Sequence, residues 1–411
     1  MENRACRFCG AQLEYTFLDL GMSPLANSYI KESQLNSMEP FYPLHVYVCG
    51  QCLLVQLEEC SSPHHIFSDY AYFSSFSDTW LQHAKVYTEK MIEQFSLDRT
   101  SQVVEIASND GYLLQNFVEQ GIPVLGIEPA ENVAEVAKKK DIPTVVEFFN
   151  EKFAQDLCKN GTQADLLIGN NVLAHVPAIN DFVRGLKTLL KPQGVITMEF
   201  PHLMRLMEEN QFDTIYHEHF SYFSFFSVQQ IFAKHGLRIF EVDELQTHGG
   251  SLRVYCCHDQ DSTKSNHPRV LELLTRETEA GFDRLDSYLS FAGQVVHTKQ
   301  RLLEFLISAK NTGKSIAAYG APAKGNTLLN YCGIRTDFID YTVDRSPHKQ
   351  GLYLPGTHIP IRNPDAIKQT KPDYLLILPW NIKDEVMQQM AFIREWGGSF
   401  VVPIPGIMVY S

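Results

Sequence analysis

From residue 103 onward, short apolar runs alternate with stretches in which apolar residues recur every three or four positions. Compact apolar runs are typical of buried strands, and the wider spacing is typical of helices. The strand-like runs are 103–107, 124–128, 144–148, 164–170 and 194–200. The helical stretches between them are 109–121, 131–140 and 179–190. This alternation predicts a parallel sheet covered by helices on both faces.

The pattern changes twice further along the chain. After a predicted helix over 226–236, residues 237–245 and 251–257 predict two strands joined through His248-Gly249-Gly250. Residues 268–312 are mainly helical in spacing and predict a bridge between domains.

Strands and helices alternate again from about residue 313, which predicts a second, smaller α/β unit. The predicted strands there are 314–320, 337–344, 373–380 and 399–405, and the predicted helices are 324–333 and 384–390. The first 62 residues differ from both units because they carry cysteines and only short strand-like runs. We therefore expect three domains, over residues 1–62, 63–310 and 311–411.

Composition and charge narrow the function classes. The chain has 411 residues, 44% hydrophobic and 20% charged, which is typical of a globular protein. Its net charge of -13 comes without a basic stripe, so no nucleic-acid partner is predicted. No apolar run approaches the ~18 residues that span a bilayer, and the N-terminus lacks a signal-peptide pattern. We expect a cytoplasmic protein without a membrane partner.

Two cysteine pairs predict a zinc site. Cys6 and Cys9 form one Cys-x-x-Cys pair, and Cys49 and Cys52 form another. Two such pairs supply four thiolates for tetrahedral zinc. Four protein ligands leave no position open for substrate, so the zinc is predicted to be structural. Four unconnected thiols and a redox pair are the alternatives.

The loop after the first parallel strand is a candidate cofactor site. It contains Glu105, Asn109, Asp110 and Gly111, and Glu128 ends the next strand. Ligands of such sheets bind beyond the carboxyl ends of the strands, where an acid can accept the ribose hydroxyls of a nucleotide. The loop is poor in the glycines that a dinucleotide's diphosphate prefers, so S-adenosylmethionine (SAM) is favoured over NAD.

Later strands add two more groups to this site. Asn170 and Asn171 end a strand where the methionine part of SAM is expected. A plain strand-to-helix turn remains the alternative explanation for the loop.

Tyr216-His217-Glu218-His219 is the densest cluster of titratable side chains in the chain. Histidine titrates near neutral pH and suits a base that removes a proton beside a ketone. His175 follows another strand and is expected to face the same pocket. Histidines that are ordinary core or surface residues, or that bind a metal, are the alternatives.

Taken together, these motifs resemble those of the sugar C-methyltransferases of deoxysugar biosynthesis. The resemblance covers the whole chain. Besides the four cysteines, it rests on the motifs Ser-Asn-Asp-Gly (108–111), Tyr-His-Glu-His-Phe-Ser-Tyr-Phe-Ser (216–224), His-Gly-Gly-Ser-Leu-Arg (248–253) and Tyr-Gly-Ala-Pro-Ala-Lys-Gly-Asn-Thr (319–327). The fold that it implies is an α/β protein with a small N-terminal zinc-binding domain, a central Rossmann-like SAM-dependent methyltransferase domain and a C-terminal Rossmann-like α/β domain.

The resemblance also implies residue roles. His219 would remove the proton at C-3 of a nucleotide-linked 4-keto hexose, assisted by Tyr216, Glu218 and His175, with Tyr70 as a further active-site residue. Ala107 departs from the family because glycine is expected there in many relatives.

Three further residues are predicted to bind the substrate. Lys324 lies where a strand meets a helix, and backbone N–H groups at a helix start attract phosphate, so we expect it to contact the diphosphate. A plain turn is the alternative. Asn326 and His248 lie in two of the shared motifs and are also expected to contact the substrate.

The alternatives to this function are methylation of oxygen or nitrogen, a non-catalytic zinc and nucleotide-binding module, and a nicotinamide oxidoreductase. The chain is expected to act as a monomer or a simple homo-oligomer.

Overall fold

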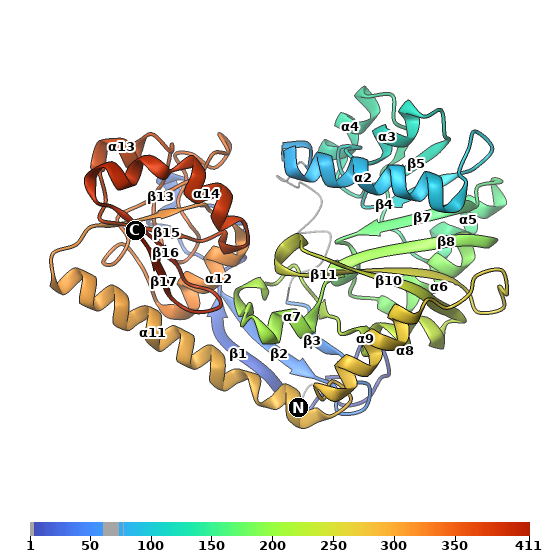
Figure 1. Cartoon of the computed structure of the whole chain (residues 1–411), viewed down its shortest axis with the longest axis horizontal. Coiled ribbons are helices and arrows are strands. Elements are labelled where there is room, and N and C mark those ends of the chain that lie inside the picture. The colour runs from blue at the N-terminus through green and yellow to red at the C-terminus, as the bar shows by residue number, and fades with distance from the viewer. Residues whose placement is uncertain (1–3, 61–73, 77) are drawn as a thin grey trace. The chain divides into compact units, whose positions relative to one another are not determined.

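The computed structural model describes residues 4–60, 74–76 and 78–411, which fold into two compact units (Figure 1). Each unit is assembled from three separate segments of the chain. Unit 1 contains Met1–Glu14, Cys49–His202 and Phe220–Arg284, and unit 2 contains Tyr15–Val48, Leu203–His219 and Leu285–Ser411. The division at residues 62 and 310 that the sequence suggests stays a prediction.

Unit 1 is built around a seven-stranded sheet with the order β10-β11-β8-β7-β4-β5-β6. The strands from β8 to β6 are parallel, and β11 and β10 run antiparallel to their neighbours. This confirms the predicted Rossmann-like sheet and its closing strand pair. The seven strands are β4 (Val103–Ile106), β5 (Val124–Ile127), β6 (Thr144–Val145), β7 (Ala164–Asn170), β8 (Leu190–Pro201), β10 (Leu237–Leu245) and β11 (Ser251–His258).

Helices cover both faces of this sheet. Helices α2, α3 and α4 lie along one face, and α5, α6 and α8 lie along the other (Figure 1). Outside the sheet, β3 (Val55–Leu57) pairs with β9 (Ser221–Tyr222). The helices of unit 1 are α2 (Asp78–Phe95), α3 (Leu114–Glu119), α4 (Glu131–Lys139), α5 (Glu151–Lys159), α6 (Ile179–Leu189), α8 (Phe225–Lys234) and α9 (Pro268–Glu279).

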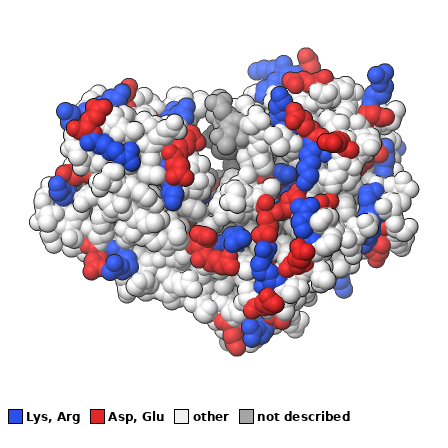
Figure 2. Space-filling view, in the orientation of Figure 1, with Lys and Arg blue, Asp and Glu red and all other residues white. Residues whose placement is uncertain are grey.

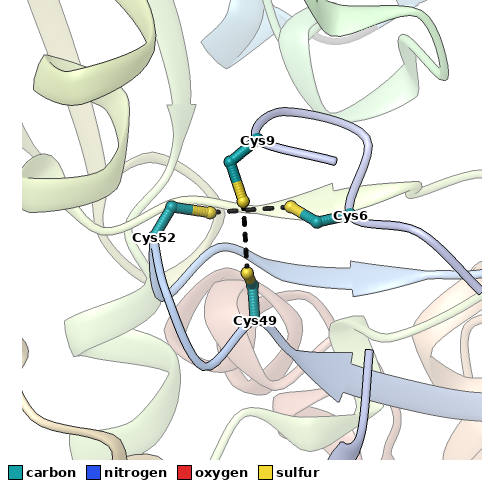
Figure 3. A group of neighbouring side chains, drawn as sticks. All are labelled: Cys6, Cys9, Cys49 and Cys52. Carbon is teal, nitrogen blue, oxygen red and sulfur yellow. Dashed lines mark hydrogen bonds between the residues drawn. The ribbon is translucent and has the colours of Figure 1, made fainter. Parts of the chain in front are cut away.

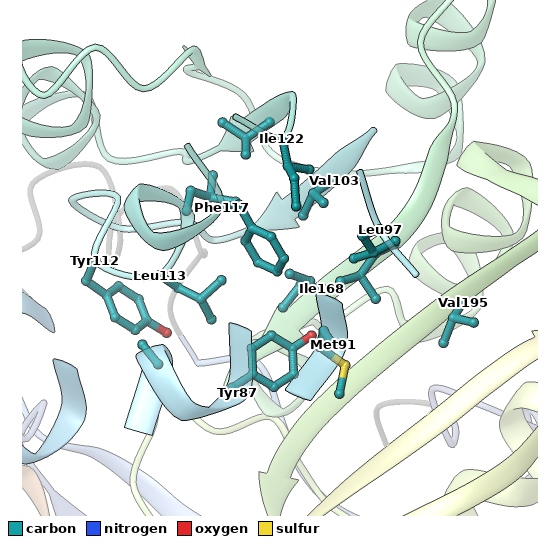
Figure 4. Close-up of a cluster of buried hydrophobic side chains, with 14 of the residues drawn as sticks. Tyr87, Met91, Leu97, Val103, Tyr112, Leu113, Phe117, Ile122, Ile168 and Val195 are labelled. Carbon is teal, nitrogen blue, oxygen red and sulfur yellow. The ribbon is translucent and has the colours of Figure 1, made fainter. Parts of the chain in front are cut away.

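A buried apolar cluster joins α2 and α3 to the sheet (Figure 4). Helix α2 contributes Ala84, Tyr87 and Met91, which recur at helical spacing on one face. Phe117 of α3 is fully buried in the same cluster. The sequence analysis did not predict α2, although this spacing was a signal for it.

Unit 2 contains a six-stranded sheet with the order β14-β13-β12-β15-β16-β17, in which only the β16–β17 pair is antiparallel. An antiparallel hairpin of β1 (Tyr15–Ser23) and β2 (Tyr42–Val48) belongs to the same unit. Phe17 of β1 stacks on Phe291 of α11, with ring centroids 5.2 Å apart. The remaining strands are β12 (Ile316–Tyr319), β13 (Thr342–Val343), β14 (Ile361–Arg362), β15 (Tyr374–Ile377), β16 (Ser399–Val402) and β17 (Met408–Tyr410).

The helices of unit 2 are α7 (Leu203–Glu208), α10 (Leu285–Leu289), α11 (Phe291–Asn311), α12 (Ala323–Cys332), α13 (Ala366–Thr370) and α14 (Lys383–Gln389). The helical stretch predicted over 268–312 comprises α9 of unit 1 and α10 and α11 of unit 2.

Several predicted elements are shorter than expected. Strands β6 and β13 have two residues each, and α3 begins only at Leu114 because residues 107–111 make tight left-handed turns. Helices α5 and α13 and strands β14 and β17 were not predicted.

Charged side chains of both signs are interspersed on the face shown in Figure 2. Many form ion pairs, such as Arg184 with Glu151 at 2.6 Å. Exposed pairs of this kind add little stability, so the core has to hold the fold. Within the described ranges, no helix combines the length and apolar character needed to cross a membrane.

Replacing Phe117 with alanine should lower the free energy of unfolding by about 3–5 kcal/mol, because it leaves a cavity between α3 and the sheet. The neighbouring Val118 is 38% exposed, and Val118→Ala should change the free energy of unfolding by less than about 0.5 kcal/mol. Urea unfolding of both variants checks this. A similar loss in the two would contradict the position of Phe117 in the core.

Candidate active site and zinc site

The two Cys-x-x-Cys pairs lie in tight turns of unit 1. In the first turn the N–H of Gly10 donates to the carbonyl of Cys6, and in the second the N–H of Leu53 donates to the carbonyl of Cys49. Gly10 and Leu53 both have positive φ, of 79° and 60°. These reversals aim the sulfurs of each pair in one direction.

The four sulfurs converge on one point (Figure 3). The Sγ atoms of Cys6, Cys9, Cys49 and Cys52 all lie within 4.8 Å of one another. Zn–S bonds of about 2.3 Å in a tetrahedron place sulfurs about 3.8 Å apart, so the four thiolates fit one zinc ion. The Nε2 of Gln56 donates to the Cys6 sulfur at 3.1 Å, which is the kind of outer contact that orients a metal ligand.

Left-handed backbone shapes the predicted cofactor loop after β4. Ala107, Asn109 and Gly111 have φ of 55°, 51° and 77°. A Cβ at Gly111 would lie 2.3 Å from the Cδ1 of Ile142, so only glycine fits there. Positive φ at Ala107 explains why glycine is expected at this position, since alanine carries a strain of about 1 kcal/mol there.

The carboxylate of Glu128, directly after β5, is anchored by backbone donors. It accepts hydrogen bonds from the N–H of Asn109 and from the N–H of Ala130, both at 2.9 Å. The carboxylate thus holds the β4 loop against the end of β5. The Asn109 side chain in turn accepts from the N–H of Ser74 at 2.9 Å.

Three buried oxygen atoms beside this loop have no hydrogen-bond partner among the described residues. They are Glu105 Oε2, Asp110 Oδ1 and Asn170 Oδ1. Burial, followed by the charges of Glu128 and Asp110, raises the pKa of Glu105 well above its usual range. Buried acceptors require donors or positive charge. SAM carries an ammonium group and a sulfonium, so these acceptors fit it.

A second group of candidates lies at the carboxyl end of β7, also in unit 1. Asn171 lies before the short turn η3 (Leu173–His175), and His175 is the last residue of that turn. The Nδ2 of Asn171 lies 3.3 Å from Nε2 of His248, which has φ of 56° in the turn η5 (Thr247–Gly249). The structure therefore brings His248 to the cofactor loops of unit 1.

Unit 2 holds the Tyr-His-Glu-His segment. The Tyr216 and His219 rings lie face to face at a tilt, with centroids 4.1 Å apart. His219 Nδ1 donates to the carbonyl of Thr214 at 3.0 Å, since a carbonyl oxygen only accepts. His217 instead uses Nε2 to reach the carbonyl of Pro43 at 3.2 Å, and burial lowers its pKa. The two histidines therefore make these hydrogen bonds through different ring nitrogens.

Glu218 lies between these histidines and is buried. The Nδ2 of Asn27 donates to Glu218 Oε1 at 2.6 Å. Burial raises the pKa of Glu218 to about 7, although the Asn27 hydrogen bond opposes the rise. This carboxyl group is therefore partly protonated at neutral pH. Asn27 lies nearly two hundred positions away in the chain, and nothing in the sequence pointed to it.

Lys324, at the start of α12, lies among polar and aromatic groups. Its Nζ lies 4.4 Å from the centroid of the Trp380 ring and donates to Asn381 Oδ1 at 2.8 Å. Burial lowers the pKa of Lys324, while the charge of Asp213 opposes this. Asp213 accepts from Trp380 Nε1 at 2.7 Å, and burial raises its pKa to about 6. Asp213 was not predicted, although it lies three residues before Tyr216.

In the turn before α12, at least one backbone N–H group already donates within the protein and is not available to a phosphate. The N–H of Ala321 donates to Asp344 Oδ2 at 2.8 Å, in the same way that the β4 loop of unit 1 donates to Glu128. Asn326 is buried, and its Nδ2 donates to the carbonyl of Ala26. Lys324 is thus better placed than the backbone or Asn326 to meet a diphosphate. Tyr70, the remaining predicted residue, lies outside the described residues.

Three family models match the chain. The model described as C-methyltransferase C-terminal domain matches residues 246–405. The model described as methyltransferase domain matches residues 80–242, and a zinc binding domain matches residues 6–67.

Known proteins match over very different lengths. The C-methyltransferase NovU of Streptomyces niveus is 34% identical over 406 residues, which are 99% of this chain and 96% of that protein. A ubiquinone biosynthesis O-methyltransferase of Bartonella tribocorum is 25% identical over 116 residues, 26% of this chain and 47% of that protein. The SAM-bound structure of magnesium protoporphyrin IX methyltransferase from Synechocystis covers 43% of this chain and 79% of its own, with 15% identity and a TM-score of 0.34.

Replacing Cys52 with serine should abolish stoichiometric zinc binding and lower the melting temperature, because three thiolates no longer close the tetrahedron. Zinc content per chain after gel filtration, measured by mass spectrometry, checks this. Cys158→Ser is the matched control, since Cys158 lies outside the cluster, and it should keep its zinc. Full zinc in the Cys52 variant would contradict the site.

Glu218→Gln should stabilise the protein at pH 8 but not at pH 5. The raised pKa means that Glu218 stays protonated in the folded state between about 4.5 and 7, while the unfolded chain has lost the proton. Stability from this group is therefore complete below about pH 4.5 and is lost as the pH rises through 7. Glutamine avoids the loss, a gain of up to about 3 kcal/mol.

Urea unfolding at the two pH values measures the difference. Glu209→Gln, at an exposed position, is the control and should change little at either pH. An equal effect of Glu218→Gln at both pH values would rule out the raised pKa.

Proposed function

Since this chain belongs to the family of SAM-dependent C-methyltransferases, we propose that it methylates C-3 of a 4-keto deoxysugar linked to a nucleoside diphosphate, with His219 as the base. The full-length match to a C-methyltransferase favours carbon as the acceptor atom over oxygen or nitrogen. The observation that carries the role of His219 is the hydrogen bond from its Nδ1 to the carbonyl of Thr214.

That hydrogen bond fixes the tautomer of His219. With the proton on Nδ1, the basic lone pair of the neutral imidazole lies on Nε2. The carbonyl of Thr214 also stabilises the imidazolium that forms when Nε2 accepts a proton. His217 has the opposite arrangement, because its Nε2 donates to Pro43. Burial also lowers the pKa of His217, which weakens that imidazole as a base.

The reaction that this base supports starts at the carbon next to the C-4 ketone. Nε2 of His219 takes the proton from C-3, and the electron pair of the broken C–H bond moves into an enolate. SAM, when bound, supplies a methyl group activated by its positively charged sulfur. The new C–C bond at C-3 would replace the bond between the methyl group and sulfur, so that S-adenosylhomocysteine leaves. The C-4 carbonyl is then restored, and the imidazolium keeps the proton until solvent removes it.

Hydrogen-bond donors have to stabilise the enolate oxygen. Tyr216 lies against the His219 ring and supplies a hydroxyl from the same segment. Glu218 is a second donor, because its pKa of about 7 keeps a share of the carboxyl groups protonated while Asn27 occupies Oε1. The resemblance implies His175 as a further helper, and this residue belongs to unit 1.

We assign the cofactor to unit 1 and the diphosphate to unit 2. Glu128 would accept the ribose hydroxyls of SAM, and the buried oxygens of Glu105, Asp110 and Asn170 would receive its positive groups. Lys324 has its pKa lowered by burial, so an anionic diphosphate would restore its full charge.

Replacing His219 with asparagine should lower the rate of methyl transfer by at least about 100-fold, because no base remains to form the enolate. It should equally slow the exchange of the C-3 hydrogen with deuterated solvent, followed by NMR. His297→Asn, at an exposed position of α11, should leave both rates unchanged. An unchanged rate of C-3 hydrogen exchange in the His219 variant would exclude this residue as the base. Methylation by the wild type without any exchange of the C-3 hydrogen would indicate an oxygen or nitrogen acceptor.

A further inference from the structure

A buried carboxylate near the end of β8 contacts several elements around the predicted cofactor site. Glu199 is fully buried, and its Oε1 accepts from the hydroxyl of Thr247 at 2.9 Å. Its Oε2 accepts from Arg253 at 2.7 Å and lies 3.1 Å from Nε2 of His83. Its main-chain carbonyl accepts from the N–H of Asn171 at 2.7 Å. All of these residues belong to unit 1.

The contact with Thr247 controls the turn that presents His248. His248, Gly249 and Gly250 have φ of 56°, 93° and 119°, so three successive residues have positive φ angles. A non-glycine residue at positive φ costs about 1 kcal/mol and needs its surroundings to hold it. The Thr247 hydroxyl, tied to Glu199, is the anchor directly before this run.

The contact with His83 links Glu199 to His248 by a second route, through Trp80. The His83 ring stacks on Trp80, with centroids 4.9 Å apart and planes 18° apart. The Trp80 ring meets the His248 ring edge-on at 5.4 Å. The contacts thus form a closed circuit from Glu199 through Thr247, His248, Trp80 and His83 back to Glu199.

Arg253 supplies the charge that allows this carboxylate to be buried. It lies on β11, five residues after His248 in the His-Gly-Gly-Ser-Leu-Arg motif, and also packs over the Tyr87 ring at 4.5 Å. Burial would raise the pKa of Glu199, but the His83 hydrogen bond and the Arg253 charge lower it to about 2. Glu199 therefore stays ionised throughout the physiological range.

From this circuit we infer that Glu199 is a positioning residue at the predicted cofactor site, whose side chain holds the His248 turn by way of Thr247 and whose main-chain carbonyl holds Asn171. The inference rests on the proposed function for its effect on turnover. It also gives the His-Gly-Gly-Ser-Leu-Arg motif one purpose: the histidine contacts Asn171, the glycines make the turn, and the arginine pairs with the carboxylate.

A buried carboxylate with a purely structural role offers a comparison in the same unit. Glu277 is fully buried and accepts from His202 at 2.6 Å and from the N–H groups of Phe225 and Phe226 at 2.7 Å. Its partners join α9 to the start of α8. They include none of the residues predicted to bind cofactor or substrate.

The test uses the full-length protein and two pairs of variants. Thr247→Val removes the hydroxyl but leaves Glu199 paired with Arg253 and His83, and Thr247→Ser restores the hydroxyl. Glu199→Gln and Glu277→Gln remove equally buried charges. For each variant we would measure the melting temperature, the Kd of S-adenosylhomocysteine by calorimetry, and kcat and KM for methyl transfer.

Thr247→Val should fold normally, bind S-adenosylhomocysteine about 3- to 10-fold more weakly and lose about 10-fold in kcat/KM, because a displaced His248 loses its contact with the Asn171 side chain. Thr247→Ser should return both values to those of the wild type. Glu199→Gln should weaken binding as well as stability, whereas Glu277→Gln should lower stability alone.

Wild-type binding and turnover in Thr247→Val would overturn the inference, as would an equal loss of affinity in Glu277→Gln. If Glu199→Gln fails to fold, the threonine pair still decides. If the wild-type enzyme methylates no keto sugar nucleotide, the proposed acceptor is wrong, while the calorimetry still tests Glu199.

Discussion

A carboxylate removed from water has to be surrounded by donors or positive charge, because leaving it unpaired costs several kcal/mol. Three buried carboxylates among the described residues of unit 1 illustrate this requirement. Glu128 gathers the N–H groups of the β4 loop, Glu199 gathers side chains from α2 and β11, and Glu277 gathers the start of α8. Each carboxylate makes a loop conformation depend on a sheet or helix that packing has already fixed. The pocket is thus ordered from the core outward.

Environment also separates the roles of two similar side chains. Glu199 faces an arginine and a histidine, and its pKa falls to about 2. Glu218 accepts a hydrogen bond from the neutral amide of Asn27, and burial raises its pKa to about 7. The first is a permanent anion that can organise its neighbours. The second can carry a proton at neutral pH, which is what an acid beside a developing enolate requires.

Local patterns in the sequence predicted the zinc cluster, the central sheet and its closing antiparallel strands. Such features depend on residues that are close in the chain, as in each Cys-x-x-Cys turn. The partners of the functional groups were not predictable in the same way. Asn27 reaches Glu218 across 191 positions and Arg253 reaches Glu199 across 54, so only folding brings them together. The short strands β6 and β13 were overestimated because apolar residues also occur outside strands, as at Val146, which follows β6 and is 37% exposed.

The interleaving of the units has a consequence for how such a protein can change over generations. The chain passes from one unit to the other at five points. The Tyr-His-Glu-His segment belongs to unit 2, although the segments before and after it in the sequence belong to unit 1. A single gene crossover between Tyr15 and Arg284 would therefore give a hybrid enzyme pieces of both units from each parent. New acceptor preferences are expected to arise by point substitution within an intact frame, not by the shuffling of whole modules.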